Sequence, residues 1–302
     1  MSLSDGATAR PDLGMKLQAD AMLPGPPQAN DLMGVSDPTL IEERPYNNKI
    51  PDSYDASKPT PLLVLLHGFT ASGQLQDLYL GLGNAATERG WLFAFPDGTQ
   101  NPAGLRYWDA TDACCNFANP PQDDVAYLNA VIDDMKTHYN VDPKRVYLFG
   151  HSNGAFMSHR LACDSADRIA GIASLAGSTW NDEWRCAPSV PVGVLEIHGT
   201  LDVLVAYNGG SFFPTSAAYP GARDTVSRWA SLNGCGELTD TSEKMDIETL
   251  IPFAETKVAR ASGCKENGAA ELWTMQGVGH VPILNDTFKT KLFEFYDAHP
   301  KP

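Results

Sequence analysis

The sequence predicts an α/β fold with a mostly parallel central sheet and helices on both of its faces. Its apolar segments of strand length are continuous, as in Leu62–Leu66, and such strands are typical of a sheet that is covered on both faces. Helical segments alternate with these strands, which favours parallel pairing. The hydrophobic content of 43% is sufficient for a large core.

The expected elements begin at residue 62. The strands are Leu62–Leu66, Trp91–Phe95, Arg145–Phe149, Ile169–Leu175, Val192–Ile197 and Glu271–Met275, all short apolar runs. The helix Gln122–Tyr139 is expected because Val125, Leu128, Val131 and Met135 recur at helical spacing. The other expected helices are Ala155–Cys163, Thr225–Leu232 and Thr287–Ala298.

Residues 1–40 differ in composition from the rest of the chain. They hold several prolines among small polar residues and show no sustained periodicity, so we expect a loosely ordered N-terminal tail. No internal repeat or linker divides the remainder. We therefore expect residues 41–302 to form a single domain, because one α/β domain often fills such a length.

A glycine-flanked serine lies between an expected strand and an expected helix. The segment Gly150-His151-Ser152-Asn153-Gly154 follows the strand Arg145–Phe149 and precedes the helix Ala155–Cys163. A serine on such a sharp turn is exposed for reaction, and the turn requires small residues on either side of it. The pentapeptide alone is equally compatible with a glycine-rich turn in which Ser152 only caps the helix. Evidence for a nucleophile must come from its partners.

An acid and a histidine follow two later strands, where reacting groups of an α/β sheet gather. Asp202 follows Val192–Ile197, and His280 follows Glu271–Met275. The order serine, acid, histidine is the one that an α/β-hydrolase needs. We expect Ser152 as nucleophile, His280 as general base and Asp202 as the carboxylate that orients His280.

Other histidines and acids fit these roles less well. His138 and His159 lie within expected helices, His299 lies near the C-terminus, and Asp97 follows a strand that is too early in the order. His198 precedes the turn that bears Asp202, and we expect it to be a hydrogen-bonded turn residue. His151 is part of the turn around Ser152 and is expected to be structural.

Two backbone N–H groups are expected to stabilise the oxyanion of a tetrahedral intermediate. One belongs to Asn153, directly after the nucleophile, and the other to the loop after the first central strand. In that loop Gly68 permits close approach of the backbone, so Phe69 is the expected second donor.

Six cysteines lack the Cys-x-x-Cys spacing of a zinc or redox site. Disulfides formed in an oxidising compartment are the favoured interpretation, and reduced cysteines in a cytosolic enzyme are the alternative. We expect Cys235 to pair with Cys264 across a polar segment. A bridge between the neighbours Cys114 and Cys115 is expected to be strained, so these two are expected to pair with Cys163 and Cys186, in an order that stays open.

The charge and hydropathy of the chain exclude some partners. The formal net charge of −15 repels phosphate backbones, so a nucleic-acid partner is not expected. No apolar run reaches the length of a membrane span, and residues 1–40 lack the pattern of a signal peptide. The expected chemistry needs no metal or cofactor, and the sequence carries no signal of an oligomeric state.

Taken together, the motifs resemble those of the secreted polyhydroxybutyrate depolymerase and feruloyl esterase-like group of α/β-hydrolases. The resemblance runs from about Arg44 to the C-terminus and implies Ser152, Asp202 and His280 as the triad, as well as export of the protein. One departure is the sequence after His280, which reads Val281-Pro282-Ile283 where many relatives have a residue and then Trp-Pro. The motifs that carry the resemblance are Leu66-His67-Gly68, Phe95-Pro96-Asp97-Gly98, Trp108 to Cys115, Asp123-Asp124-Val125, Gly150 to Gly154, His198 to Asp202, Tyr207 to Gly210 and Gly279-His280.

The predicted function is that of a serine carboxylic-ester hydrolase that forms an acyl-enzyme. Its expected substrates are polyester oligomers or small apolar or aromatic esters, bound by Trp108, Tyr107, Tyr207 and Phe212, although loop aromatics also serve to pack loops. A serine peptidase with the same triad is one alternative. A non-catalytic binding protein on a hydrolase scaffold is another.

Overall fold

The computed structural model describes residues 37–117, 119–214 and 216–302. The predicted N-terminal tail therefore lies outside the described residues, apart from residues 37–40. Within this short stretch, Thr39 and Leu40 already belong to the first helix, α1 (Thr39–Glu43). The extent of the predicted domain stays a prediction.

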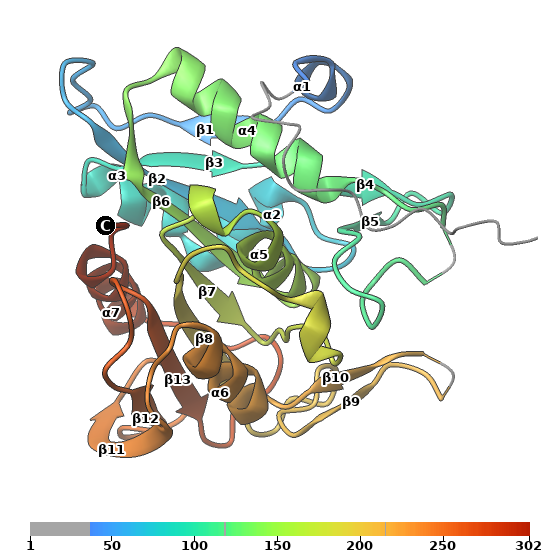
Figure 1. Cartoon of the computed structure of the whole chain (residues 1–302), viewed down its shortest axis with the longest axis vertical. Coiled ribbons are helices and arrows are strands. Elements are labelled where there is room, and N and C mark those ends of the chain that lie inside the picture. The colour runs from blue at the N-terminus through green and yellow to red at the C-terminus, as the bar shows by residue number, and fades with distance from the viewer. Residues whose placement is uncertain (1–36, 118, 215) are drawn as a thin grey trace, which may run out of the picture. The chain divides into compact units, whose positions relative to one another are not determined.

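A nine-stranded sheet forms the centre, in the order β1-β3-β2-β6-β7-β8-β13-β12-β11 (Figure 1). All neighbouring pairs from β3 to β13 are parallel, and the edge strands are antiparallel. The predicted mostly parallel sheet is confirmed. Its strands are β1 (Asn47–Lys49), β2 (Thr60–Leu66), β3 (Leu92–Phe95), β6 (Val141–His151), β7 (Gly171–Leu175), β8 (Gly193–Gly199), β11 (Leu238–Met245), β12 (Thr256–Ala261) and β13 (Ala269–Met275).

Helices cover both faces of the sheet, as the continuous apolar strands predict. In β2 the side chains of Leu62, Val64 and Leu66 pack into one cluster, and those of Leu63 and Leu65 pack into another. The first cluster includes residues of α4 (Asp124–His138), α5 (Asn153–Asp164) and α6 (Ala222–Leu232). The second includes residues of α2 (Gly73–Leu80), α3 (Leu82–Glu88) and α7 (Asp286–Ala298). Because each face has its own core, the central strands carry apolar side chains on both faces, as in β2.

The segment between Cys235 and Cys264 forms two strands that hydropathy did not reveal. They are β11 and β12, an antiparallel pair at the edge of the sheet. The side chains of β11 are largely exposed, so its sequence is polar and lacks an apolar run. The predicted Cys235–Cys264 disulfide is present and closes this segment.

The expected pairing of the other four cysteines is wrong. Cys163, at the end of α5, bonds to Cys186, and their Cα atoms are 4.9 Å apart, a usual spacing for a disulfide. Cys114 and Cys115 bond to each other across a cis peptide bond. Since Cys163 and Cys186 are bonded to each other, Cys114 and Cys115 have only each other as partners. The described residues contain no free cysteine.

Two small hairpins extend from the sheet near the carboxyl ends of its strands. They consist of β4 (Thr99–Gln100) with β5 (Arg106–Tyr107), and of β9 (Gly209–Ser211) with β10 (Ala218–Pro220). Within the ranges that the structure describes, none of the helices has both the length and the apolar character needed to cross a membrane.

Candidate active site

Ser152 lies on the predicted sharp turn between β6 and α5. Its backbone has φ 56° and ψ −120°, a conformation that non-glycine residues rarely adopt and that is held only by its surroundings. The turn has no room for side chains beside it. A Cβ at Gly150 would overlap the carbonyl oxygen of Gly154, and a Cβ at Gly154 would overlap that of Leu66. Both glycines are therefore required for the geometry that presents Ser152.

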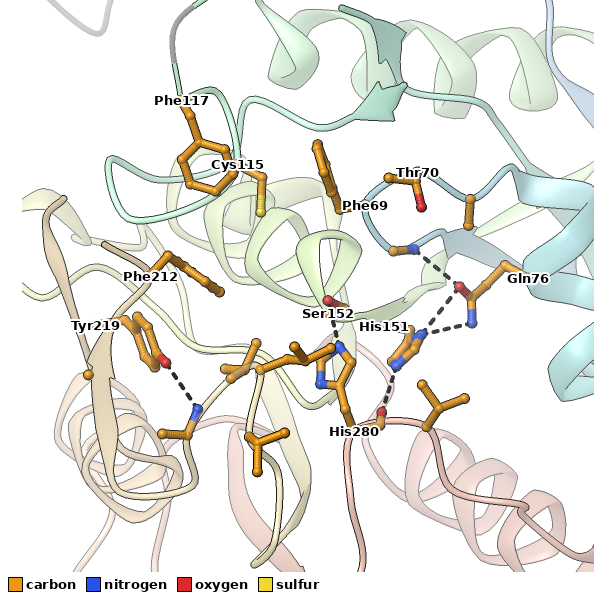
Figure 2. A pocket seen from close by; sticks show the side chains of 18 of the residues that line it. Phe69, Thr70, Gln76, Cys115, Phe117, His151, Ser152, Phe212, Tyr219 and His280 are labelled. Atoms are coloured by element: carbon orange, nitrogen blue, oxygen red, sulfur yellow. Dashed lines mark hydrogen bonds between the residues drawn. The ribbon is translucent and has the colours of Figure 1, made fainter. Parts of the chain in front are cut away.

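Ser152, His280 and Asp202 are joined by hydrogen bonds, although they come from three separate loops. Ser152 Oγ lies 2.9 Å from His280 Nε2, and His280 Nδ1 lies 2.7 Å from Asp202 Oδ2 (Figure 2 shows the first contact). A carboxylate only accepts, so Nδ1 carries the proton and Nε2 is left to accept the serine proton. This is the tautomer that a general base for Ser152 requires.

The backbone and two histidines hold Asp202 as a carboxylate. Its Oδ1 accepts hydrogen bonds from the amides of Leu204 and Val205, each at 2.9 Å. Burial by itself raises the pKa of Asp202, but the bonds from His198 and His280 outweigh burial and hold that pKa well below its usual range. Asp202 therefore stays charged across the neutral range.

The loop after β2 approaches Ser152 closely, as predicted. A Cβ added at Gly68 would stand 3.4 Å from the Cβ of Ser152, so a larger residue would press on the serine. Within the described part of the chain, the amides of Phe69 and Asn153 donate no hydrogen bond to the protein. Both predicted oxyanion donors are thus free to bind a ligand oxygen.

His67 holds this loop in place as a neutral, buried imidazole. The amide of Gly98 donates to His67 Nε2 at 2.8 Å, so Nδ1 carries the proton and donates to the carbonyl of Gly68, also at 2.8 Å. Burial lowers the pKa of His67 to about 4, which agrees with a neutral ring.

The side chain of Asn153 has a structural role that the sequence did not indicate. Its Oδ1 accepts from the amide of Trp108 at 2.7 Å, and its Nδ2 donates to the carbonyl of the same residue at 2.9 Å. Nδ2 also lies 3.5 Å from the sulfur of Cys114. Asn153 thus connects the turn that presents Ser152 to the loop that carries the Cys114–Cys115 disulfide.

His151 connects the loop of Gly68 to the loop of His280. Gly68 donates its amide to Gln76 Oε1 at 3.1 Å, and Gln76 Nε2 lies 3.2 Å from His151 Nδ1. The other ring nitrogen of His151 donates to the carbonyl of His280 at 3.0 Å (Figure 2). These contacts agree with the structural role expected for His151, and Gln76 is a further contributor that the sequence did not indicate.

A cavity of about 820 Å³ opens beside Ser152 and His280, with mainly apolar walls. Aromatic side chains line one side of it, among them Phe69, Phe117, Phe212 and Tyr219, together with Cys115 (Figure 2). Phe213 is a further lining residue. Of the residues expected to bind substrate, Phe212 alone is part of this wall.

The structure does not place Trp108, Tyr107 or Tyr207 in the cavity wall. Trp108 and Tyr107 are fully buried, and the Trp108 indole donates to the carbonyl of His67 at 3.0 Å. Tyr207 bonds through its hydroxyl to Thr274 Oγ1 at 2.8 Å. The polar atoms of Trp108 and Tyr207 thus find partners inside the protein, and Tyr107 is buried, so these aromatics pack loops against the sheet.

Comparisons with known proteins show what this chain is similar to. Residues 53–217 match a model of the family described as phospholipase/carboxylesterase. Feruloyl esterase B of Piromyces equi is 31% identical over 239 residues, which cover 77% of this chain and 41% of the relative. Poly(3-hydroxyalkanoate) depolymerase C of Paucimonas lemoignei is 26% identical over 247 residues, which cover 73% and 54%. The chain spans about half the length of these two relatives.

A solved structure bears on the fold. The acetyl xylan esterase from Aspergillus awamori superposes with a TM-score of 0.56 at 16% identity, over 87% of this chain and 98% of that one. Together with the family match, this likeness confirms the predicted α/β-hydrolase fold. The names of the two relatives confirm the resemblance that the motifs indicated.

Proposed function

The chain belongs to the phospholipase/carboxylesterase family, and we propose that it hydrolyses carboxylic esters through an acyl-enzyme formed on Ser152. The observation that carries this proposal is the hydrogen-bonded series Ser152, His280 and Asp202 at the edge of an apolar cavity. Each member has the tautomer or charge that its role demands.

The first half of the reaction acylates the enzyme. Ser152 Oγ attacks the ester carbonyl carbon while its proton passes to His280 Nε2, and Asp202 stabilises the imidazolium that forms. The amides of Phe69 and Asn153 hold the oxyanion of the tetrahedral intermediate. The intermediate collapses as the carbon–oxygen bond to the alcohol breaks, and His280 returns the proton to the departing alcohol oxygen.

The second half releases the acid. Water gives a proton to His280 Nε2 as its oxygen attacks the acyl carbon, and a second tetrahedral intermediate forms in the same place. Its collapse breaks the bond to Ser152 Oγ, which recovers the proton from His280. No group other than the triad, the two amides, the ester and water is needed for these steps.

The cavity supports an ester with an apolar or aromatic acyl group. Its aromatic wall offers flat apolar surface, and offset or edge-on contacts with a ring favour aromatic ligands. Similarity to a protein named feruloyl esterase and to one named poly(3-hydroxyalkanoate) depolymerase supports esters of hydroxycinnamic acids or hydroxyalkanoate oligomers as the substrates to compare first.

The three disulfides support export to an oxidising compartment, outside the cell or in the periplasm. Disulfides persist where thiols are not kept reduced. Mass spectrometry of the protein purified from its natural compartment, with and without reduction, would test this point.

The proposed function is tested by replacing the nucleophile. Ser152→Ala is expected to fold as the wild type and to lose more than about a thousandfold of the rate on p-nitrophenyl butyrate. Ser231→Ala, which alters an exposed serine of α6, is the matched control and should keep full activity. A folded Ser152→Ala variant with the wild-type rate would refute the proposal.

A further inference from the structure

Behind Asp202, a series of buried polar side chains leads away from the cavity. Glu196 and His198 lie on the same face of β8, two residues apart, and both are almost inaccessible to solvent. They meet His159 of α5 and Trp229 of α6, the helices that pack on this face (Figure 1). The reaction described above uses none of these four side chains.

The hydrogen bonds determine where the protons lie, beginning from the indole. Trp229 Nε1 can only donate, and it donates to His159 Nδ1 at 2.9 Å. His159 therefore carries its proton on Nε2, which lies 3.2 Å from Glu196 Oε2 and donates to it. The other oxygen of Glu196 lies 3.1 Å from His198 Nδ1. Burial by itself raises the pKa of Glu196, but the bonds from His159 and His198 lower it overall. Glu196 is therefore a carboxylate.

His198 faces acceptors on both sides. Its Nδ1 meets the carboxylate of Glu196, and its Nε2 lies 2.9 Å from the carbonyl oxygen of Val205 and 3.4 Å from Asp202 Oδ2. Neither a carbonyl nor a carboxylate can donate, so both ring nitrogens must carry protons. Burial opposes this charge, but the bonds with Asp202 and Glu196 raise the pKa of His198 to about 9. His198 is thus an imidazolium at neutral pH.

The same oxygen of Asp202 serves both histidines. Asp202 Oδ2 accepts from His280 Nδ1 at 2.7 Å and forms the longer ion pair with His198 Nε2. Burying a second carboxylate and a cation costs desolvation free energy, which apolar residues at these positions of β8 would avoid. The arrangement brings a fixed positive charge to the buried side of the carboxylate that orients the general base.

We propose that His198 is a positioning residue for the reaction: held as an imidazolium by Glu196, it fixes Asp202 toward His280 and offsets part of the charge that Asp202 presents to it. The proposal rests on the proposed function of Ser152, His280 and Asp202. Glu196 supplies the counter-charge that keeps His198 protonated in a buried place.

Few other titratable groups face these rings. Against His198 lies the ring edge of Tyr207, with ring centres 5.7 Å apart, and the hydroxyl of Tyr207 bonds to Thr274 Oγ1. Against His280 lies the ring of His151, with centres 5.1 Å apart, and burial lowers the pKa of His151 to about 4. Asp202 is the group that joins the two histidines, so an effect of His198 on His280 passes through it.

The test is the pH profile of the His198→Gln variant, which lacks the charge at that position. Hydrolysis of p-nitrophenyl butyrate would be followed from pH 4.5 to 9, with kcat and KM determined separately. His280 must be neutral to accept the serine proton, and the lost cation makes a proton on His280 easier to hold. We expect the acidic limb of the kcat/KM profile to move to higher pH by roughly one unit, because the like charge is gone.

The pH-independent plateau gives a second result from the same data. We expect the plateau kcat to fall by about tenfold because Asp202 loses one of its fixed partners, and KM to change little. His138→Gln, on the exposed surface of α4, is the matched control and should leave both limb and plateau in place. An acidic limb that stays where it is in folded His198→Gln would overturn the proposal, because a residue needed only for packing lowers kcat without moving the limb.

A measurement on the wild-type protein determines the charge of His198 even if the His198→Gln variant does not fold. The ¹⁵N signals of the His198 ring, assigned through its own backbone, should show both nitrogens protonated at pH 7.5. An unprotonated ring nitrogen at that pH would overturn the proposal. The protonation state does not depend on turnover, whereas full activity of Ser152→Ala would refute the proposed function itself, so the two failures are distinguishable.

Discussion

Gly154, in the first turn of α5, packs directly against the carbonyl oxygen of Leu66 at the end of β2. This contact places the helix that follows Ser152 against the strand that leads into the loop of Gly68. The distance between Ser152 and the loop that carries the free amide of Phe69 is therefore fixed by backbone packing, with no side chain between them. Glycine at 154 is a requirement of the site's geometry.

We predict that Gly150→Ala lowers both stability and activity. A Cβ at this position would overlap the carbonyl oxygen of Gly154 and crowd Ser158 Oγ, so the turn must shift. Overpacking of this kind costs about 1–3 kcal/mol of the free energy of unfolding, and a shifted Ser152 loses its contact with His280. Urea unfolding and p-nitrophenyl butyrate hydrolysis measure the two effects. Gly236→Ala is the matched control, since its Cβ would stand 3.4 Å from the nearest atom. Equal behaviour of the two variants would contradict the prediction.

We predict that acid destabilises the protein partly through His67. Its pKa is about 4 in the folded state and about 6.5 when unfolded, so protons bind preferentially to the unfolded chain. The stabilisation is complete above pH 6.5 and is lost as the pH falls from 6.5 toward 4, by up to about 3 kcal/mol. Urea unfolding at several pH values in this window should give a shallower pH dependence for His67→Asn than for the wild type or His138→Asn. Parallel curves for all three proteins would contradict it.

Much of the fold could be predicted because its strands are apolar on both faces. Segments such as Leu62–Leu66 have the length and the continuous apolar character of a strand that is covered on both faces. The edge pair β11 and β12 could not be predicted, because the exposed side chains of β11 leave no hydropathy signal. The Cys235–Cys264 pair could be predicted, but the pairing of the other four cysteines could not, since it depends on loops around Cys114 and Cys186 that follow no period.

The residues of the site also fall into a predictable and an unpredictable group. Ser152, Asp202 and His280 could be chosen because each follows a predictable strand, and the structure brings them into contact. The directions of loop aromatics could not be predicted, because the buried Trp108 and the cavity-lining Phe117 both lie in irregular loops whose sequence has no period. The sequence also indicates the buried polar pair of β8. Glu196 and His198 alternate with apolar residues inside a buried strand, which places two polar groups on one covered face.

We predict that removing the Cys235–Cys264 disulfide lowers the free energy of unfolding but leaves catalysis unchanged. The bridge closes a segment with a sequence separation of 29, and release of such a loop costs about 3.6 kcal/mol in the chain-entropy account. The bridge follows Ala261, at the end of β12 that pairs near the start of β13, whereas His280 follows the other end of β13. The double variant Cys235→Ser with Cys264→Ser should unfold at lower urea concentration and keep its kcat. A large loss of kcat under stabilising conditions would show that the edge strands support the site.

We predict that Phe212→Ala lowers activity on esters with large acyl groups more than activity on a short acetyl ester. Phe212 lines the cavity, with ring centres 5.1 Å from Tyr219 and 6.0 Å from Phe117, and truncation removes apolar surface from the acyl wall. We expect kcat/KM for p-nitrophenyl octanoate and methyl ferulate to fall by about tenfold, and that for p-nitrophenyl acetate to change much less. Phe253→Ala, at an exposed position outside the cavity, is the control. A uniform loss on all three esters would contradict a role in acyl recognition.

The central claim is that Ser152 carries the acyl group, and covalent labelling tests it most directly. The folded wild type would be treated with a fluorophosphonate, digested and analysed by mass spectrometry, beside the Asp202→Asn variant. We predict one adduct, on Ser152, formed much more slowly in Asp202→Asn because His280 loses the partner that fixes its tautomer. Wild-type protein that hydrolyses esters while Ser152 stays unlabelled, or an adduct on another residue, would contradict the account.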